Sequence, residues 1–124
     1  MPKTEKEHEQ VHHSSLALDE IHDDPMGRDR KHLDEEYVIF ENTGTTPLDL
    51  SGWTVENEAG DEYQFPDGTE LAAGAHLTLH SGWGTDTAAE HYWCSDDPVW
   101  GNLGDTIFVR DAAGVLRLRE SFDE

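Results

Sequence analysis

The first residues along the chain whose types and spacing suggest chemistry are His8-Glu9-Gln10-Val11-His12, which match the H-E-x-x-H pattern of zinc proteases. That chemistry needs both imidazoles on one face of a helix, a third metal ligand, and a glutamate acting as general base in a buried cleft. Here the pattern lies in a polar segment with no apolar face that would bury such a helix. Ser15 and Leu18 also stand where the longer form of the motif has glycine and a third histidine. We interpret the match as chance and expect a protein that is not an enzyme.

A second candidate is the acidic segment 19–36, which bends at Pro25-Met26-Gly27. Carboxylates are the hard oxygen ligands that calcium prefers, and backbone carbonyls at the bend would complete a site. The residues that would ligate calcium are Asp23, Asp24, Asp29, Asp34 and Glu36. The competing interpretation is a solvated acidic loop in a protein that is acidic throughout, and the spread of acid along the chain favours it. Calcium is therefore an alternative, and we expect that no cofactor is required.

Aromatic residues in the second half of the chain form a third candidate. Trp83, Tyr92, Trp93 and Trp100 lie between glycine- and serine-containing segments. Rings at loops either make a contact surface for a protein or carbohydrate, or fill the open end of a core. We expect Trp93 in the core and assign Trp83 and Trp100 to a candidate binding surface. No G-x-S-x-G elbow, P-loop or G-x-G-x-x-G motif is present.

The composition is strongly acidic, with 28 Asp and Glu against 8 Lys and Arg and a net charge of -20. Acid spread over the whole chain with few lysines is typical of salt-adapted archaeal proteins, in which surface carboxylates keep a protein hydrated. The charge gives no support for nucleic-acid binding, which basic residues drive. Arg110, Arg117 and Arg119 form the main basic cluster, and we expect them to pair with nearby carboxylates.

Length and segment composition indicate one domain. The chain has 124 residues, enough for a single core. Residues 1–15 are polar and are expected to be a flexible lead-in to a domain at 16–124. No apolar run is long enough to cross a membrane, and the N-terminus has no signal-peptide core, so we expect a cytoplasmic protein. Cys94 is the single cysteine and cannot form an internal disulfide.

Alternation of apolar and polar residues predicts β-strands, and no long segment has a helical period. We expect strands beginning near Leu16 and at 37–40, 53–56, 63–65, 76–80, 91–94, 106–110 and 115–122. The residues expected to supply most of the core are Leu18, Val38, Phe40, Leu48, Leu50, Trp53, Val55, Phe65, Leu77, Leu79, Ile107, Val109, Val115 and Leu118.

Several short motifs resemble the lamin-tail domain family over about residues 15–122. They are Glu36-Tyr37-Val38, Phe40-Glu41-Asn42, Leu48-Asp49-Leu50-Ser51-Gly52-Trp53, Phe65-Pro66-Asp67-Gly68, Leu71 with Ala73-Gly74, Gly104-Asp105-Thr106-Ile107 and Asp111-Ala112-Ala113-Gly114. The resemblance implies an immunoglobulin-like β-sandwich, a fold found in nuclear lamins and in many prokaryotic proteins, often beside hydrolase domains. These are structural motifs, so they indicate a fold more directly than an activity.

The sequence therefore predicts an all-β, immunoglobulin-like sandwich that acts as a non-catalytic binding or scaffolding module. We expect a protein or polymeric partner, bound for instance at an exposed sheet edge, and a monomer or weak dimer. The family resemblance also admits nucleic acid, which the charge does not support. The alternative is a calcium-stabilised structural or adhesive domain that uses segment 19–36, and a small hydrolase is a remote third reading.

Overall fold

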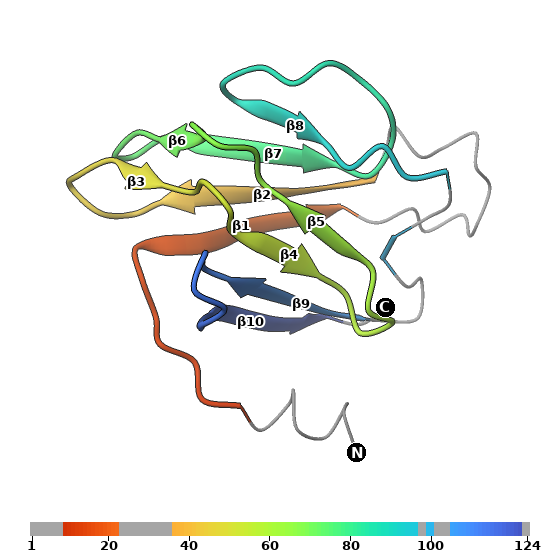
Figure 1. Ribbon diagram of the computed structural model, residues 1–124, viewed down its shortest axis with the longest axis horizontal. Helices are drawn as coiled ribbons and strands as arrows, with labels where there is room; N and C mark the ends of the chain where they lie inside the picture. The colour runs from red at the N-terminus through yellow and green to blue at the C-terminus, as the bar shows by residue number, and fades with distance from the viewer. Residues whose placement is uncertain (1–8, 23–35, 97–98, 101–104, 123–124) are drawn as a thin grey trace.

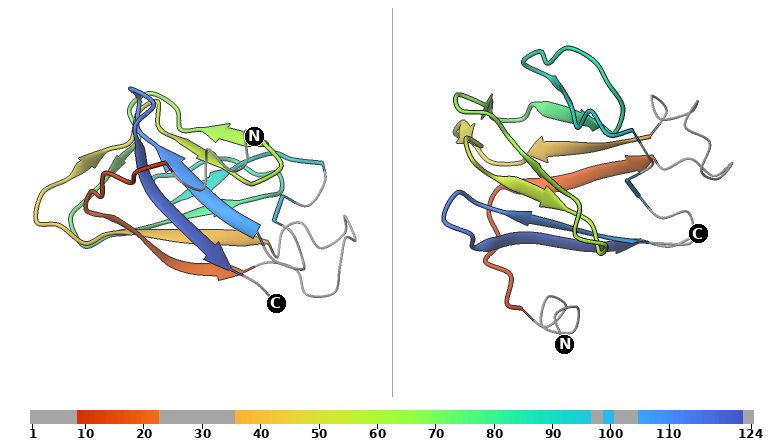
Figure 2. Two further views of the ribbon diagram at one scale, coloured as in Figure 1. Left: turned by 90° about the horizontal axis from the view of Figure 1, so that it is seen from below. Right: turned by 45° about the vertical axis from the view of Figure 1, so that its right-hand side comes forward.

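The computed structural model describes residues 9–22, 36–96, 99–100 and 105–122, and this part of the chain is all-β. Two four-stranded sheets form the layers of a sandwich, and a two-stranded sheet lies at one end (Figures 1 and 2). The first sheet, in the order β1-β2-β7-β8, contains β1 (Leu16–His22), β2 (Tyr37–Asn42), β7 (His76–His80) and β8 (Glu90–Tyr92). The second, in the order β10-β9-β4-β5, contains β10 (Leu116–Phe122), β9 (Asp105–Arg110), β4 (Thr54–Glu56) and β5 (Glu62–Gln64). The small sheet pairs β3 (Leu48–Asp49) with β6 (Glu70–Leu71).

Neighbouring strands in these sheets run antiparallel except β7 and β8, which run parallel. Strands β1 and β10 lie close together along one edge of the sandwich. Among the described residues, no helix has the length and apolar character needed to cross a membrane. The predicted immunoglobulin-like sandwich is confirmed.

The core lies between the two sheets and follows from strand alternation. Val38 and Phe40 of β2 are fully buried, whereas the residues between and beside them face outward. The opposing sheet contributes Val55, Ile107 and Val109. Of the residues expected in the core, Leu18, Leu48 and Val115 are only half-buried. Val115 is a correction: it precedes β10 and is half-buried, whereas Leu118 on β10, opposite Val109, belongs to the core between the sheets. The other buried hydrophobic residues are Leu16, Leu71, Val99, Trp100, Phe108 and Leu116.

Two sequence motifs are joined by backbone hydrogen bonds. The Gly52 amide donates to the Phe65 carbonyl at 3.1 Å, and the Phe65 amide donates to the Trp53 carbonyl at 2.8 Å. The Gly68 amide donates to Ser51 Oγ at 2.7 Å. Gly52 has a φ of 78°, a left-handed conformation that glycine adopts without steric cost. The D-L-S-G-W and F-P-D-G motifs thus fit together as one structural unit, which explains their occurrence as a pair.

A β-bulge in β1 changes which residues face outward. Leu18 is opposite Phe40 and Glu20 is opposite Ile39, so Asp19 is an extra residue between them. Asp19 and Glu20 are consequently both exposed, while Ile21 returns to the core side. Because of the bulge, Leu18 and Ile21 lie on the same core-facing side of β1 although they are three residues apart.

Candidate functional site

Four aromatic rings form a row across the outer face of the β1-β2-β7-β8 sheet. The residues are register partners from strand to strand: His22, Tyr37, His80 and Tyr92. The rings of His22 and Tyr37 stack with centroids 4.8 Å apart, and those of His80 and Tyr92 stack at 4.6 Å. Tyr37 and His80 are tilted at 6.0 Å between centroids, which connects the two stacks. We call these four residues the aromatic row.

Carboxylates lie beside the aromatic row. The Tyr37 hydroxyl donates to Glu20 Oε2 at 3.4 Å, and the Tyr92 hydroxyl donates to Glu90 Oε1 at 3.3 Å. His80 Nε2 is 3.1 Å from the same oxygen of Glu90. Loss of solvent, followed by the neighbouring glutamate, raises the pKa of both tyrosines. The hydroxyls therefore remain protonated donors, and the face combines ring surfaces with negative charge.

The loop after β7 continues this surface beyond β8. A Cβ placed on Gly84 would overlap the Tyr92 ring, so only glycine permits this close packing. The preceding residue, Trp83, is 67% exposed, and its indole Nε1 donates to Asp96 Oδ1 at 3.1 Å. The position of Trp83 agrees with its predicted place on an exposed aromatic surface; a binding role for it stays a prediction.

Trp100 does not share that surface, which corrects the prediction. Its side chain is 2% exposed and packs edge-on against Trp93, with ring centroids 5.9 Å apart. Phe122 contacts it from β10 at 6.2 Å. The glycines around Trp100 suggested an exposed loop, but burying an indole removes more apolar area from water than any other side chain would at this position.

The residues predicted to ligate calcium divide into two groups. Asp23, Asp24, Asp29 and Asp34 lie outside the described residues. Glu36 is 1% exposed, and its Oε1 accepts hydrogen bonds from the Val99 amide at 2.8 Å and, more weakly, from the Trp100 amide at 3.4 Å. This carboxylate serves to hold residues 99–100 against the core, which is a structural role distinct from the predicted one.

A second polar feature is an open hollow of about 410 Å³ beside the F-P-D-G motif. The buried His91 lies at its inner wall, with Nδ1 3.3 Å from Asp86 Oδ2 and 3.3 Å from the Tyr63 hydroxyl. Asp86 also accepts a hydrogen bond from the Tyr92 amide, which holds the loop to β8. The Thr69 hydroxyl, which lines the hollow, donates to the Pro66 carbonyl at 2.7 Å. The side chains of His91 and Thr69 are thus held by contacts with neighbouring residues.

The family comparison matches residues 10–122 to the model of the lamin tail domain. The chain belongs to the lamin tail domain family. Lamin tail domains are immunoglobulin-like structural domains. A comparison with curated proteins gave no match.

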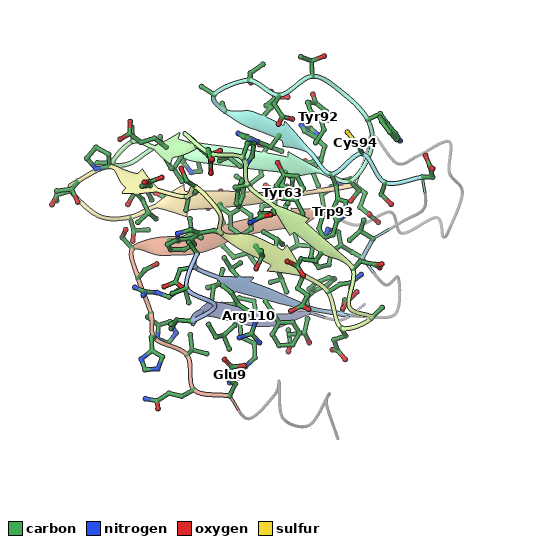
Figure 3. The ribbon with its side chains drawn as sticks, in the orientation of Figure 1. Glu9, Tyr63, Tyr92, Trp93, Cys94 and Arg110 are labelled. Carbon is green, nitrogen blue, oxygen red and sulfur yellow. The ribbon has the colours of Figure 1, made fainter. Side chains whose placement is uncertain are left out.

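Glu9, the glutamate of the H-E-x-x-H match, forms an ion pair with Arg110 in this lamin tail domain. Glu9 Oε2 is 2.7 Å from Arg110 Nη1, Oε1 is 2.8 Å from Nη2, and the Glu9 carbonyl accepts from Arg119 Nη1 at 2.7 Å (Figure 3). Arg117 pairs with Asp111 at 3.2 Å. The expected pairing of Arg110 and Arg117 with carboxylates is confirmed. Residues 1–8, including His8, lie outside the described residues, so a flexible lead-in there stays a prediction.

Three members of the aromatic row were not among the residues predicted from sequence: His22, Tyr37 and His80. Alternation places Tyr37 and His80 on the outward faces of their strands. Their proximity depends on strand register, which alternation alone does not give. The sequence signal that remains is an aromatic or imidazole residue at one end of each strand of the sheet.

Proposed function

We propose that this lamin tail domain is a non-catalytic interaction module that binds a protein partner through the outer face of its β1-β2-β7-β8 sheet. The observation that carries the proposal is the aromatic row, in which four register partners from four strands form two ring stacks joined by a tilted contact. His22 is exposed and the other three rings are partly exposed on the outer face, and aromatic residues are enriched where proteins bind one another.

The chemistry of the face favours a partner segment that carries arginine or lysine. Glu20 and Glu90 contact the rings of the row and supply negative charge beside them. Guanidinium and ammonium groups are attracted both to carboxylates and to the faces of tyrosine rings. The net charge of -20 would add long-range attraction for a basic segment at moderate salt. Nucleic acid is disfavoured by the same charge.

The test uses arginine-rich peptides with interspersed apolar residues as the probe, and acidic peptides of the same length as controls. Amide chemical shifts of the isotope-labelled chain report where a peptide binds. We expect perturbations centred on β1, β2, β7 and β8, and weaker binding as salt rises because screening reduces the attraction. Perturbations centred on β9 and β10, or equal binding of acidic peptides, would contradict the proposal.

Matched charge variants separate a local effect from a change in total charge. Glu90→Gln removes one negative charge beside the aromatic row, and Glu62→Gln removes one from an exposed position on β5 in the other sheet. We expect the first variant to weaken peptide binding several-fold and the second to leave it within about twofold, since surface ion pairs contribute up to about 1 kcal/mol. Equal losses from the two variants would mean that net charge alone attracts the peptide.

A further inference from the structure

Three potential metal ligands converge on the same outer face as the aromatic row, at the other end of the strands. Asp19 of β1, Glu41 of β2 and His76 of β7 each offer one ligand atom, and these atoms lie within 4.8 Å of one another. His76 Nε2 is 3.7 Å from Asp19 Oδ2 and 3.8 Å from Glu41 Oε1. One imidazole and two carboxylates thus surround a common point above three adjacent strands.

The arrangement follows from strand pairing and from alternation in β1. Glu41 and His76 are direct register partners, so their side chains leave the same face opposite one another. Asp19 follows Ala17 on the outward side of β1, as strand alternation requires. The bulge after Asp19 adds Glu20 to the outward residues and returns Ile21 to the core side.

The spacing suits a small divalent transition-metal ion. Zinc binds histidine nitrogen and carboxylate oxygen at about 2.0–2.2 Å, so tetrahedral ligands stand roughly 3.3–3.6 Å apart. The two distances from His76 Nε2 are slightly longer than this, and the 4.8 Å within which all three ligand atoms lie is longer still, so side-chain rotations must bring the ligands together around the ion. Calcium fits less well because it takes six to eight oxygen ligands and disfavours imidazole.

We propose that Asp19, Glu41 and His76 form a binding site for a divalent transition-metal ion, zinc in the first instance, with water completing the coordination. The three side chains are one-third to one-half exposed, so the ion would exchange with solvent. Three protein ligands give a weaker site than the four of a structural zinc centre, and we expect a dissociation constant on the order of micromolar. Bound metal would fasten the bulged edge strand β1 to β2 and β7.

The experiment is calorimetric titration of the full chain with zinc, followed by magnesium and calcium under the same conditions. The chain used carries His8→Gln, His12→Gln and His13→Gln, so that the N-terminal histidines cannot bind metal. We expect one zinc ion per chain, an increase in melting temperature on zinc addition, and no comparable effect of magnesium or calcium. Absence of zinc binding up to millimolar concentration, or a stoichiometry other than one, would overturn the proposal.

Ligand variants then locate the ion. His76→Gln, Asp19→Asn and Glu41→Gln each remove one ligand with little change of shape, and each should weaken zinc binding about 100-fold or more, beyond the 10–100-fold typical of lost supporting contacts. His80→Gln is the matched control, because His80 lies on the same strand beside Glu90 at 3.1 Å but has no second carboxylate in such a cluster. Its zinc affinity should be unchanged. Equal losses in His76→Gln and His80→Gln would mean that zinc binds elsewhere on the face. Zinc binding is measured without a peptide, so the outcome is independent of the proposed protein interaction.

Discussion

Glu9 and Arg110 form a bidentate ion pair that joins residues 101 positions apart in the sequence. Arg110 projects from β9, and Glu9 comes from the segment that precedes β1 (Figure 3). The His12 amide adds a hydrogen bond to the Leu116 carbonyl at 2.8 Å. The segment before the first strand is therefore attached to the β9-β10 hairpin of the opposite sheet, and the described part of it belongs to the folded domain.

The first prediction concerns acid stability at this ion pair. The hydrogen bond from Arg110 lowers the pKa of Glu9 below its ordinary value of 4.5. A carboxyl whose folded pKa is lowered stabilises the fold above its unfolded pKa, and that contribution is lost as pH falls through the folded value. Glu9→Gln should therefore lower the free energy of unfolding at pH 7 by up to about 1 kcal/mol, and by less below pH about 4. Urea denaturation at both pH values measures this, and an undiminished effect in acid would contradict it.

The strand pattern could be predicted from sequence because alternation is a local property. Val38 and Phe40, or Leu77 and Leu79, identify their buried faces from spacing alone. Pairing between strands is not local. The contact between the rings of Tyr37 and His80 depends on a register that is set by the whole fold.

The position of the bulge at Asp19 also could not be predicted from sequence. Leu16, Leu18 and Ile21 have spacings of two and three, which no regular strand buries on one face. This irregular spacing is the sequence signal of the extra residue, but it does not say which position bulges. The burial of Trp100 likewise could not be predicted from the residues beside it in the sequence. Trp100 is buried because Trp93 and Phe122 pack against it in the fold.

The second prediction concerns alkaline pH. Burial raises the pKa of Tyr63 well above its ordinary value of 10.0, with Asp86 and Cys94 adding to the effect. A group whose folded pKa is raised stabilises the fold below its unfolded pKa, and this contribution is lost as pH rises through the folded value. The free energy of unfolding should therefore decline above about pH 10, and Tyr63→Phe should flatten that decline. Ultraviolet titration of tyrosinate checks this; ionisation of Tyr63 at pH 10 in the folded protein would contradict it.

The third prediction concerns salt. With 28 acidic and 8 basic residues, repulsion between surface carboxylates destabilises the compact state when it is poorly screened. The Debye length falls from about 8 Å at 0.15 M to about 3 Å at 1 M salt, so the melting temperature should rise with potassium chloride over this range. The control is calcium chloride at micromolar concentration in fixed potassium chloride. A melting temperature independent of potassium chloride would contradict the salt-adaptation hypothesis, and a rise with micromolar calcium would favour the calcium alternative.

The fourth prediction uses two tryptophans as a matched pair. Trp100 is 2% exposed between Trp93 and Phe122, whereas Trp83 is 67% exposed. Trp100→Ala leaves a large cavity and should lower the free energy of unfolding by about 3–5 kcal/mol. Trp83→Ala removes an exposed ring with one hydrogen bond to Asp96. It should change the free energy of unfolding by about 0.5 kcal/mol or less. Denaturant midpoints of the two variants measure the difference. Similar stabilities would mean that Trp100 does not fill the core; a large loss for Trp83→Ala would show that its loop supports the fold as well as lying exposed.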